Sequence, residues 1–338
     1  MHAALTLRFA RVFRHAALTA ALAITTCALT PLLTPTAEAQ PYPNKPIRLV
    51  VPYSAGTSTD VLGRLYAQKL GEALGQNIIV ENKAGAGGNI AGEAVARAAP
   101  DGYTITLSTS AVHATNPALY GRLPFDTIKD FSHITLLASA PNMLTVNPKV
   151  PVKNIAELIA YAKANPGKLT YISAGSGTSP HMAGELLKSM AGIDIVHVPY
   201  KNITQGFADL LGGQVAMTFY HVPVIYPFVK DGRLRALGVA TRTRSALAPE
   251  VPPIADTLPG YEIRPWWGVS GPAGLPAEVV DKLYSVTTSI LTDADTRQRF
   301  ISIGLEISLM SMKEFNDFIG TELTKWTKVV KESGAKVD

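Results

Sequence analysis

The chain has 338 residues, of which 47% are hydrophobic and 17% are charged, and its formal net charge is +5. This length is too great for one small core and suits one large domain or two of medium size. The mild positive charge forms no long run of one sign. Nucleic-acid binding is therefore disfavoured, because it requires a clustered basic surface.

The first forty residues have the pattern of an export signal. Three arginines precede an uncharged stretch that ends in Ala37-Glu38-Ala39. Small residues at these positions suit signal peptidase, so we predict cleavage after Ala39 (residues 1–39 removed) and export to the periplasm. Two alternatives stay open, an uncleaved membrane anchor and a lipoprotein cut before Cys27. Cleavage removes the single cysteine, so the mature chain has no disulfide and no thiolate metal site.

After residue 40, short apolar runs alternate with stretches of helical periodicity. This alternation is typical of strands and crossover helices in a parallel or mixed sheet. The expected elements are, in order, a strand at 47–51, a helix at 61–74, a strand at 77–81, a helix at 90–98 and a strand at 103–107. The chain is therefore α/β from its start.

The alternation begins again after residue 150. Asn154 and Glu157 have the spacing of a helix-capping box, which predicts a helix up to residue 165. The next expected elements are a strand at 169–173, a helix at 181–190, a strand at 193–198, a helix at 207–211 and strands at 215–219 and 234–240. The C-terminal part is predicted to be helical over 276–291, 293–303 and 312–333.

Two long apolar segments, 134–146 and 263–269, connect the two α/β regions. The chain is thus expected to cross from a first lobe to a second and to return. This gives a discontinuous first domain of residues 40–141 plus 265–338, and a second domain of residues 142–264. Two crossings form a natural hinge, and a ligand usually binds in the cleft between such lobes.

Two loops share a composition that suits ligand binding. Residues 52–60 and 173–181 each follow a predicted strand, are rich in Gly, Ser, Thr and Ala, and lead directly into a helix. Glycine allows close approach of the backbone, and a helix start offers unpaired N–H donors and a positive dipole end. Neither loop contains Lys or Arg, so neutral dipoles would hold an anion. The alternative is a pair of ordinary turns with Ser or Thr caps.

Individual residues of these loops permit more than one role. Three roles stay open for Asp60: interaction with the positive end of the helix dipole, organisation of the loop, and contact with the ligand. His181 suits a hydrogen bond within its loop better than a ligand contact. A third glycine-rich segment, 82–89, lacks the spacing of dinucleotide and phosphate loops and is interpreted as a turn beside the cleft.

Common catalytic motifs are missing from the sequence, which contains neither Gly-x-Ser-x-Gly nor His-Glu-x-x-His. The histidines of the mature chain are scattered and lack metal-ligand spacing. We therefore predict a protein that is not an enzyme, with no metal and no cofactor. A triad assembled in space stays open, and Ser176 and His181 are the residues that an exported hydrolase would use.

An ordered series of motifs resembles one family, the substrate-binding receptors of tripartite tricarboxylate transporters, also called Bug proteins. The resemblance covers residues 40–338. The motifs are Tyr42-Pro43-Asn44-Lys45-Pro46-Ile47-Arg48, Glu81-Asn82-Lys83-Ala84-Gly85-Ala86-Gly87-Gly88, Ala98-Ala99-Pro100-Asp101-Gly102-Tyr103-Thr104, Leu123-Pro124-Phe125-Asp126, Lys129-Asp130-Phe131, His197-Val198-Pro199-Tyr200-Lys201 and Gly271-Pro272-Ala273-Gly274-Leu275-Pro276.

This resemblance implies a two-lobed periplasmic binding protein fold, with two mixed sheets flanked by helices and a central cleft and hinge. It also implies capture of a small organic carboxylate and transient delivery to transporter membrane subunits by what we expect to be a monomer. The two loops would clasp the carboxylate through backbone amides, hydroxyls and ordered water. Carried onto this chain, they supply Ser54, Ala55, Gly56, Thr57, Ser58 and Asp60, and Ser173, Gly175, Gly177, Thr178 and His181. An orphan receptor that passes the same ligand to a signalling partner is the alternative.

The chain departs from the family pattern at two places. Gly56 is followed by Thr57 instead of a second glycine, and Tyr220 with His221 stands where many relatives have an aspartate. Gained aromatic groups suit a flat or aromatic carboxylate or a longer diacid as well as a citrate-like one. We add Tyr53, Tyr220, His221 and Trp266 to the predicted site. Trp266 and Trp267 would point to opposite faces of a strand, so only one should face the ligand.

Overall fold

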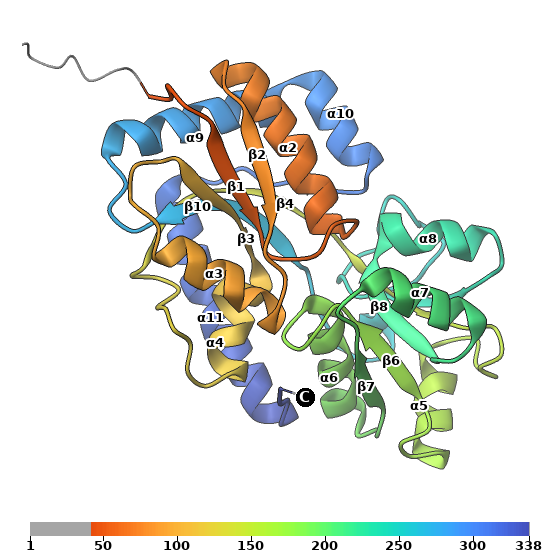
Figure 1. The fold of residues 1–338 in the computed structure, drawn as a ribbon. Helices are drawn as coiled ribbons and strands as arrows, with labels where there is room; N and C mark the ends of the chain where they lie inside the picture. The colour runs from red at the N-terminus through yellow and green to blue at the C-terminus, as the bar shows by residue number, and fades with distance from the viewer. Residues whose placement is uncertain (1–41, 338) are drawn as a thin grey trace, which may run out of the picture. The chain divides into compact units, whose positions relative to one another are not determined.

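The computed structural model describes residues 42–337, so the predicted signal, its cleavage site and Cys27 lie outside the described residues. The chain from Tyr42 onward forms one compact unit (Figure 1). Its elements are β1 (Ile47–Val51), α2 (Ser58–Leu74), β2 (Ile78–Asn82), η1 (Ala86–Gly88), α3 (Asn89–Ala96), β3 (Thr104–Thr109), η2 (Ala111–Thr115), α4 (Asn116–Leu119), β4 (Phe131–Ser139), β5 (Asn142–Val146), α5 (Ile155–Ala164), β6 (Thr170–Ser173), α6 (Ser179–Ala191), β7 (Val196–Pro199), α7 (Ile203–Gly212), β8 (Met217–His221), α8 (Val222–Lys230), β9 (Arg235–Val239), η3 (Ile254–Asp256), β10 (Trp266–Pro272), α9 (Ala277–Thr292), α10 (Ala294–Ser302), β11 (Glu306–Ile307) and α11 (Met312–Ser333).

The first sheet has six strands in the order β11-β4-β10-β3-β1-β2. β1 pairs in parallel with β2 and β3, whereas β10 pairs antiparallel with β3 and β4. Buried side chains of α2, α9 and α10 pack on one face, and those of α3, η2 and α11 lie on the other. We call this sheet with its helices lobe 1.

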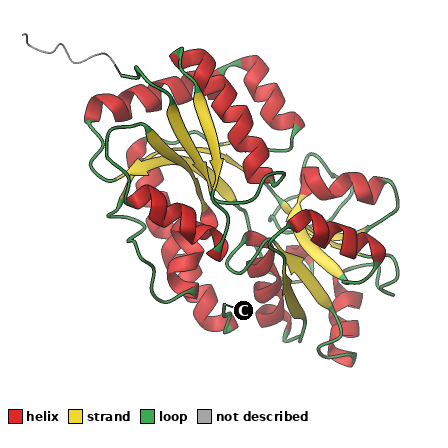
Figure 2. Ribbon diagram, viewed as in Figure 1, coloured by secondary structure: helices red, strands yellow, loops and turns green. Residues whose placement is uncertain are grey.

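The second sheet has five strands in the order β7-β6-β8-β5-β9. β6 is parallel to β7 and β8, and β5 is antiparallel to β8 and β9. One face packs against α5 and α6, and the other packs against α7 and α8. We call this sheet with its helices lobe 2. Two mixed sheets flanked by helices, visible in Figure 2, confirm the predicted α/β class.

The chain passes from lobe 1 to lobe 2 between β4 and β5, and it returns between β9 and β10. At this crossing the Ala140 N–H donates to the carbonyl of Pro265 over 3.1 Å. We propose residues 40–141 plus 265–338, and residues 142–264, as the limits of the two domains. The described part of the chain holds no helix that combines the length and apolarity of a bilayer-spanning segment.

Local signals explain most helix boundaries near the cleft. The Thr57 hydroxyl accepts from the Asp60 N–H at the start of α2, and Gly75 ends this helix with a positive φ of 65°. Asn154 caps α5 by accepting from the Glu157 N–H, as its sequence spacing predicts. Pairing with β5 extends β8 to His221, two residues beyond the predicted strand. Helix α8 and the π-helical turn η2 were not predicted.

Candidate functional site

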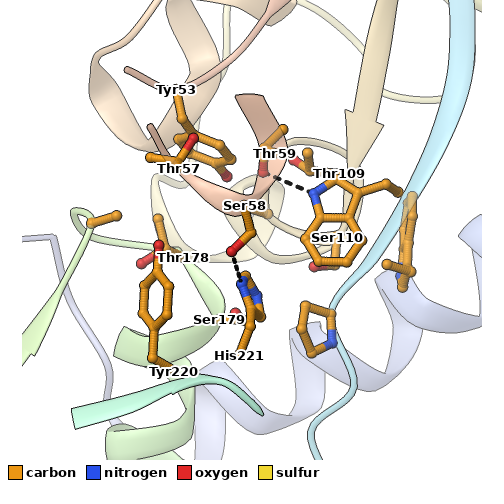
Figure 3. Close-up of a pocket in the computed structure, with 15 residues that line it drawn as sticks. Tyr53, Thr57, Ser58, Thr59, Thr109, Ser110, Thr178, Ser179, Tyr220 and His221 are labelled. Carbon is orange, nitrogen blue, oxygen red and sulfur yellow. Dashed lines mark hydrogen bonds between the residues drawn. The ribbon is translucent and has the colours of Figure 1, made fainter. Parts of the chain in front are cut away.

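A small cavity of about 40 Å³ lies between elements of both lobes, and we call it the inner cavity. It is lined by Tyr53, Thr57, Ser58, Thr59, Thr109, Ser110, Ala111, Ala174, Thr178, Ser179, Tyr220, His221, Pro265, Trp266 and Trp267 (Figure 3). Seven of these belong to the set expected from the sequence, namely Tyr53, Thr57, Ser58, Thr178, Tyr220, His221 and Trp266.

Four helical segments begin at the inner cavity or directly after a residue of its wall. Helix α2 of lobe 1 begins at Ser58, η2 begins at Ala111, α6 of lobe 2 begins at Ser179, and α8 follows its N-cap His221. The first N–H groups of a helix have no intrahelical acceptor, and its N-terminus carries a partial positive charge. The cavity wall therefore combines hydroxyl groups with positively polarised helix ends from both lobes.

The inner cavity has no formal charge in its wall. None of its fifteen described lining residues is an aspartate, glutamate, lysine or arginine. Within residues 42–337, no group of three His, Asp, Glu or Cys side chains is placed to hold a metal ion. An anion in this cavity would consequently be bound by neutral hydrogen-bond donors and helix dipoles.

His221 links the two lobes at the cavity wall. Its Nδ1 lies 2.7 Å from the Ser58 Oγ at the start of α2, as the dashed line in Figure 3 indicates. Burial lowers the pKa of His221 to about 3, so the imidazole is neutral near pH 7. Burial also raises the pKa of the neighbouring Tyr220 far above its ordinary value, although a hydrogen bond with Ser58 opposes this rise.

The two adjacent tryptophans of β10 direct their indole N–H groups to different partners. Trp267 donates to the Thr59 Oγ1 over 2.8 Å, and its ring lies edge-on to His221 with a centroid distance of 5.1 Å. Trp266 donates to Glu322 Oε2 on α11 over 3.2 Å. Trp267, which the sequence-based site left out, is therefore the indole fixed to the first loop and to His221.

Asp60 organises the first loop from a buried position. Its Oδ2 accepts from the Gly56 N–H over 2.9 Å and from Arg64 Nε over 3.1 Å, while Oδ1 accepts from Asn82 Nδ2 over 2.9 Å. Burial tends to raise the pKa of Asp60, but hydrogen bonds from Arg64, Gly56 and Asn82 outweigh it and keep the pKa below its ordinary value. Asp60 is not among the residues that line the inner cavity.

Two histidines organise the second loop in a comparable way. The Gly177 N–H donates to Nδ1 of His181 over 3.0 Å, and Ser173 Oγ lies 2.6 Å from Nε2 of His197. The two imidazoles stack with a centroid distance of 4.1 Å. The structure thus brings together two histidines that are separated in the sequence, and His181 has the loop-stabilising contact that its position suggested.

The glycine amides of the two loops already have partners. Gly56 donates to Asp60, Gly175 donates to the Ser173 hydroxyl, and Gly177 donates to His181. This differs from the expectation that these amides point at a ligand. The reason is that a short polar side chain in each loop accepts them first, which leaves hydroxyls and helix starts as the donors at the cavity.

Two further cavities adjoin the inner one. A chamber of about 670 Å³ is lined in part by Ser54, Gly175 and the glycine-rich segment 84–88. A side cavity of about 270 Å³ is lined by Gly56, and it shares Ser58 and His221 with the inner cavity. Ala55 is exposed and is not in the wall of any of these three cavities.

The glycine-rich segment forms a second contact between the lobes, which we call the glycine seam. A Cβ atom at Gly87 would overlap the Ser176 carbonyl oxygen, and one at Gly177 would overlap Asn116 Oδ1. The Tyr120 hydroxyl also donates to the Ser176 carbonyl over 3.4 Å. Because the seam needs glycine at both positions, the segment is more than a turn beside the cleft.

Several wall residues were missed by the sequence analysis. Thr59 and Ser179 lie within the predicted loops or beside their ends, and Thr109 and Ser110 follow the predicted third strand. The rule that selected the first two loops, hydroxyl residues between a strand and a helix start, would also have selected the segment 108–110. Pro265 and Trp267 have no comparable local signal.

Comparison with known proteins identifies the family to which the chain belongs. Residues 62–335 match the family described as the tripartite tricarboxylate transporter family receptor. The chain belongs to this receptor family. The resemblance expected from the sequence is thereby confirmed, as is a solute-binding role instead of an enzymatic one.

Solved structures of this receptor family share the fold. Rpa4515 from R. palustris, solved with adipate, is 35% identical, with a TM-score of 0.83 over 87% of this chain and 99% of that chain. The periplasmic binding protein BugD is 31% identical, with a TM-score of 0.82 over 87% and 99%. MatC from Rhodopseudomonas palustris, solved with bound malate, is 29% identical, with a TM-score of 0.81 over 86% and 100%. The two-lobed periplasmic receptor fold is therefore confirmed.

Proposed function

We propose that this receptor captures a small organic carboxylate, a mono- or dicarboxylate of aliphatic or aromatic type, and delivers it to the membrane subunits of a tripartite transporter. The observation that carries the proposal is the inner cavity, whose wall holds the starts of α2 and α6 and many hydroxyls but no formal charge. Such a wall suits an anion because it supplies donors without a salt bridge. The related receptors solved with adipate and malate support the ligand class.

The proposal includes the route to the periplasm and the residues of the site. The N-terminal signal directs export and is cleaved after Ala39, and the mature protein works as a monomer. The binding residues are those of the predicted set that line the three adjoining cavities, together with Thr59, Thr109, Ser110, Ser179 and Trp267. Asp60, Ser173 and His181 act indirectly by holding the loops in shape.

Thermal unfolding of the mature protein, residues 40–338, tests this function. The panel is adipate, malate, succinate, benzoate, terephthalate and aspartate, each at millimolar concentration. A ligand at 100 times its Kd stabilises the folded state by about 2.7 kcal/mol, which raises the Tm by about 4 °C in a protein of this size. A Tm that none of these acids changes would contradict the proposed function.

Two serine variants locate the binding event. Ser58→Ala removes a hydroxyl from the cavity wall, whereas Ser289→Ala removes one from an exposed position on α9. The first variant should lose affinity for the stabilising acid, and the second should bind it like the unmodified protein. Equal affinities for the two variants would place the ligand elsewhere.

A further inference from the structure

Two side chains at the adjacent ends of β5 and β8 carry buried polar atoms without partners. Among the described residues, Nε2 of His221 and both Nδ2 and Oδ1 of Asn142 have no hydrogen-bond partner. Asn142 is fully buried, and His221 is 7% exposed. Buried polar atoms in folded proteins nearly always have partners, so three such atoms in two neighbouring side chains call for a physical account.

The two side chains lie on the same side of the sheet. Asn142 pairs directly with His221 in the antiparallel β5–β8 ladder, where opposite residues have Cβ atoms about 5 Å apart. Strand alternation places them on the face of Leu144 and Phe219, which belong to the same hydrophobic cluster as Trp266. We call His221 and Asn142 together the polar floor. His221 lines the inner cavity, whereas Asn142, its partner in the ladder, is not among the lining residues.

The orientation of the imidazole is fixed by its other contacts. Nδ1 is engaged with Ser58, and the ring edge lies against Trp267, so Nε2 is the ring nitrogen left for a ligand. The contact with Ser58 joins the two lobes. Separation of the lobes would break this contact and make the imidazole accessible to an entering molecule.

The chemistry of the floor selects a particular group. Asn142 offers an amide NH₂ group as donor and a carbonyl oxygen as acceptor, and Nε2 of His221 is a donor or an acceptor according to its tautomer. A hydroxyl group both donates and accepts, so it complements the floor in either tautomer. A methylene group would leave all three atoms unpaired, and an ammonium group would be buried where no acidic residue lines the cavity.

We propose that the polar floor makes this receptor selective for hydroxycarboxylates, with the carboxylate at the starts of α2 and α6 and the hydroxyl group at His221 and Asn142. This inference rests on the proposed function. It assigns His221 and Asn142 as the residues that determine specificity, and it distinguishes them from the hydroxyl-rich wall that binds the carboxylate.

Matched acids on one carbon skeleton provide the test. The probes are succinate, malate and aspartate, and in parallel 3-phenylpropanoate, 3-phenyllactate and phenylalanine. Binding is measured by calorimetry on the mature protein. For the carbon skeleton that fits the site, the hydroxy acid should have a Kd at least about tenfold lower than the unsubstituted acid and the amino analogue. The inference would be overturned if an unsubstituted acid or its amino analogue bound as tightly as the hydroxy analogue. It would also be overturned if adipate bound and none of the hydroxy acids did.

Two apolar variants of similar shape separate recognition from folding. His221→Phe and Asn142→Leu should each reduce the preference for the hydroxy acid to within about twofold. Removal of an unpaired buried polar group is neutral or stabilising, so the Tm of the ligand-free Asn142→Leu protein should not fall. A preference that survives in both variants would also overturn the inference.

Ser58→Ala serves as the control for lobe closure. It removes the contact across the lobes but keeps the imidazole, its packing against Trp267 and Asn142, so it should weaken binding of both acids of a pair and keep the hydroxy acid the preferred one. Failure of the proposed function looks different, because then no acid of either panel changes the Tm of the unmodified protein.

Discussion

The glycine seam should control how tightly the two lobes close. In Gly87→Ala, the new Cβ would overlap the carbonyl oxygen of Ser176 in the opposite lobe. Nonbonded heavy atoms prefer separations of about 3.5 Å, so the lobes must move apart by roughly 1 Å at this point. That movement would weaken the Tyr120–Ser176 and Ser58–His221 hydrogen bonds, which are 3.4 and 2.7 Å long.

The cost follows from these two contacts. A hydrogen bond contributes about 0.5–1.5 kcal/mol net, so the closed state should lose about 1–3 kcal/mol. Ligand affinity would then fall by about 5-fold to 150-fold, because the ligand is held by the closed state. Isothermal titration calorimetry with the most stabilising acid measures this loss directly.

Gly121→Ala is the matched control for Gly87→Ala. Gly121 has a φ of 69°, close to the 62° of Gly87, but a Cβ atom there would meet nothing within 4 Å. Both variants carry the left-handed backbone penalty of about 1 kcal/mol in the open and closed states alike, so this penalty lowers stability and not affinity. Unchanged affinity in Gly87→Ala, or an equal loss in Gly121→Ala, would refute the role of the seam.

Three other measurements probe the site and its electrostatics. Burial lowers the pKa values of His133 and His221 to about 4 and 3, below the unfolded value of about 6.5. The unfolded state therefore binds more protons than the folded state as the pH falls. At pH 5 each histidine should lower the free energy of unfolding by about 2 kcal/mol. Thermal unfolding at pH 7 and pH 5 should show this loss, it should be smaller in His221→Phe, and equal stability at both values would contradict it. Binding should change by less than about threefold between 0.05 and 0.5 M salt, since no lysine or arginine lines the inner cavity, and a steep decrease in affinity would place the anion near Lys201 of the adjoining chamber. Ligand binding should alter tryptophan fluorescence, and Trp267→Phe should remove most of the change because this indole touches both the first loop and His221; an undiminished signal would assign the change to another tryptophan.

The sequence predicts most of the order of elements and the two loops that approach the cleft. Period and turn residues predict β1 through α3, and the spacing of Asn154 and Glu157 predicts α5. Local patterns fail at α8, because Pro223 and Pro227 suggest that a helix cannot form there. Pro223, however, lies in the first helical turn, where a proline is tolerated. The π-helical turn η2 has no periodic signature that a window of sequence would detect.

The composition of the site is harder to predict than the fold, because it depends on which polar groups form hydrogen bonds with each other and which stay available to a ligand. A loop rich in glycine suggests free amides, but Asp60 and His181 accept them within the loops. The polar floor depends on strand register, which pairs Asn142 with His221 although 78 positions separate them. Such pairings arise from the tertiary arrangement and leave no local trace.

The crossing between the lobes has a consequence for inheritance. The strands of lobe 2 lie in one uninterrupted stretch of the chain, and its two connections to lobe 1 are held side by side by the Ala140–Pro265 hydrogen bond. Genetic exchange at these two points would replace the five wall residues that lobe 2 contributes, Tyr220 and His221 included, while the first sheet keeps its own strands. A new ligand preference would then be acquired as a single cassette, without redesign of the lobe that carries α2.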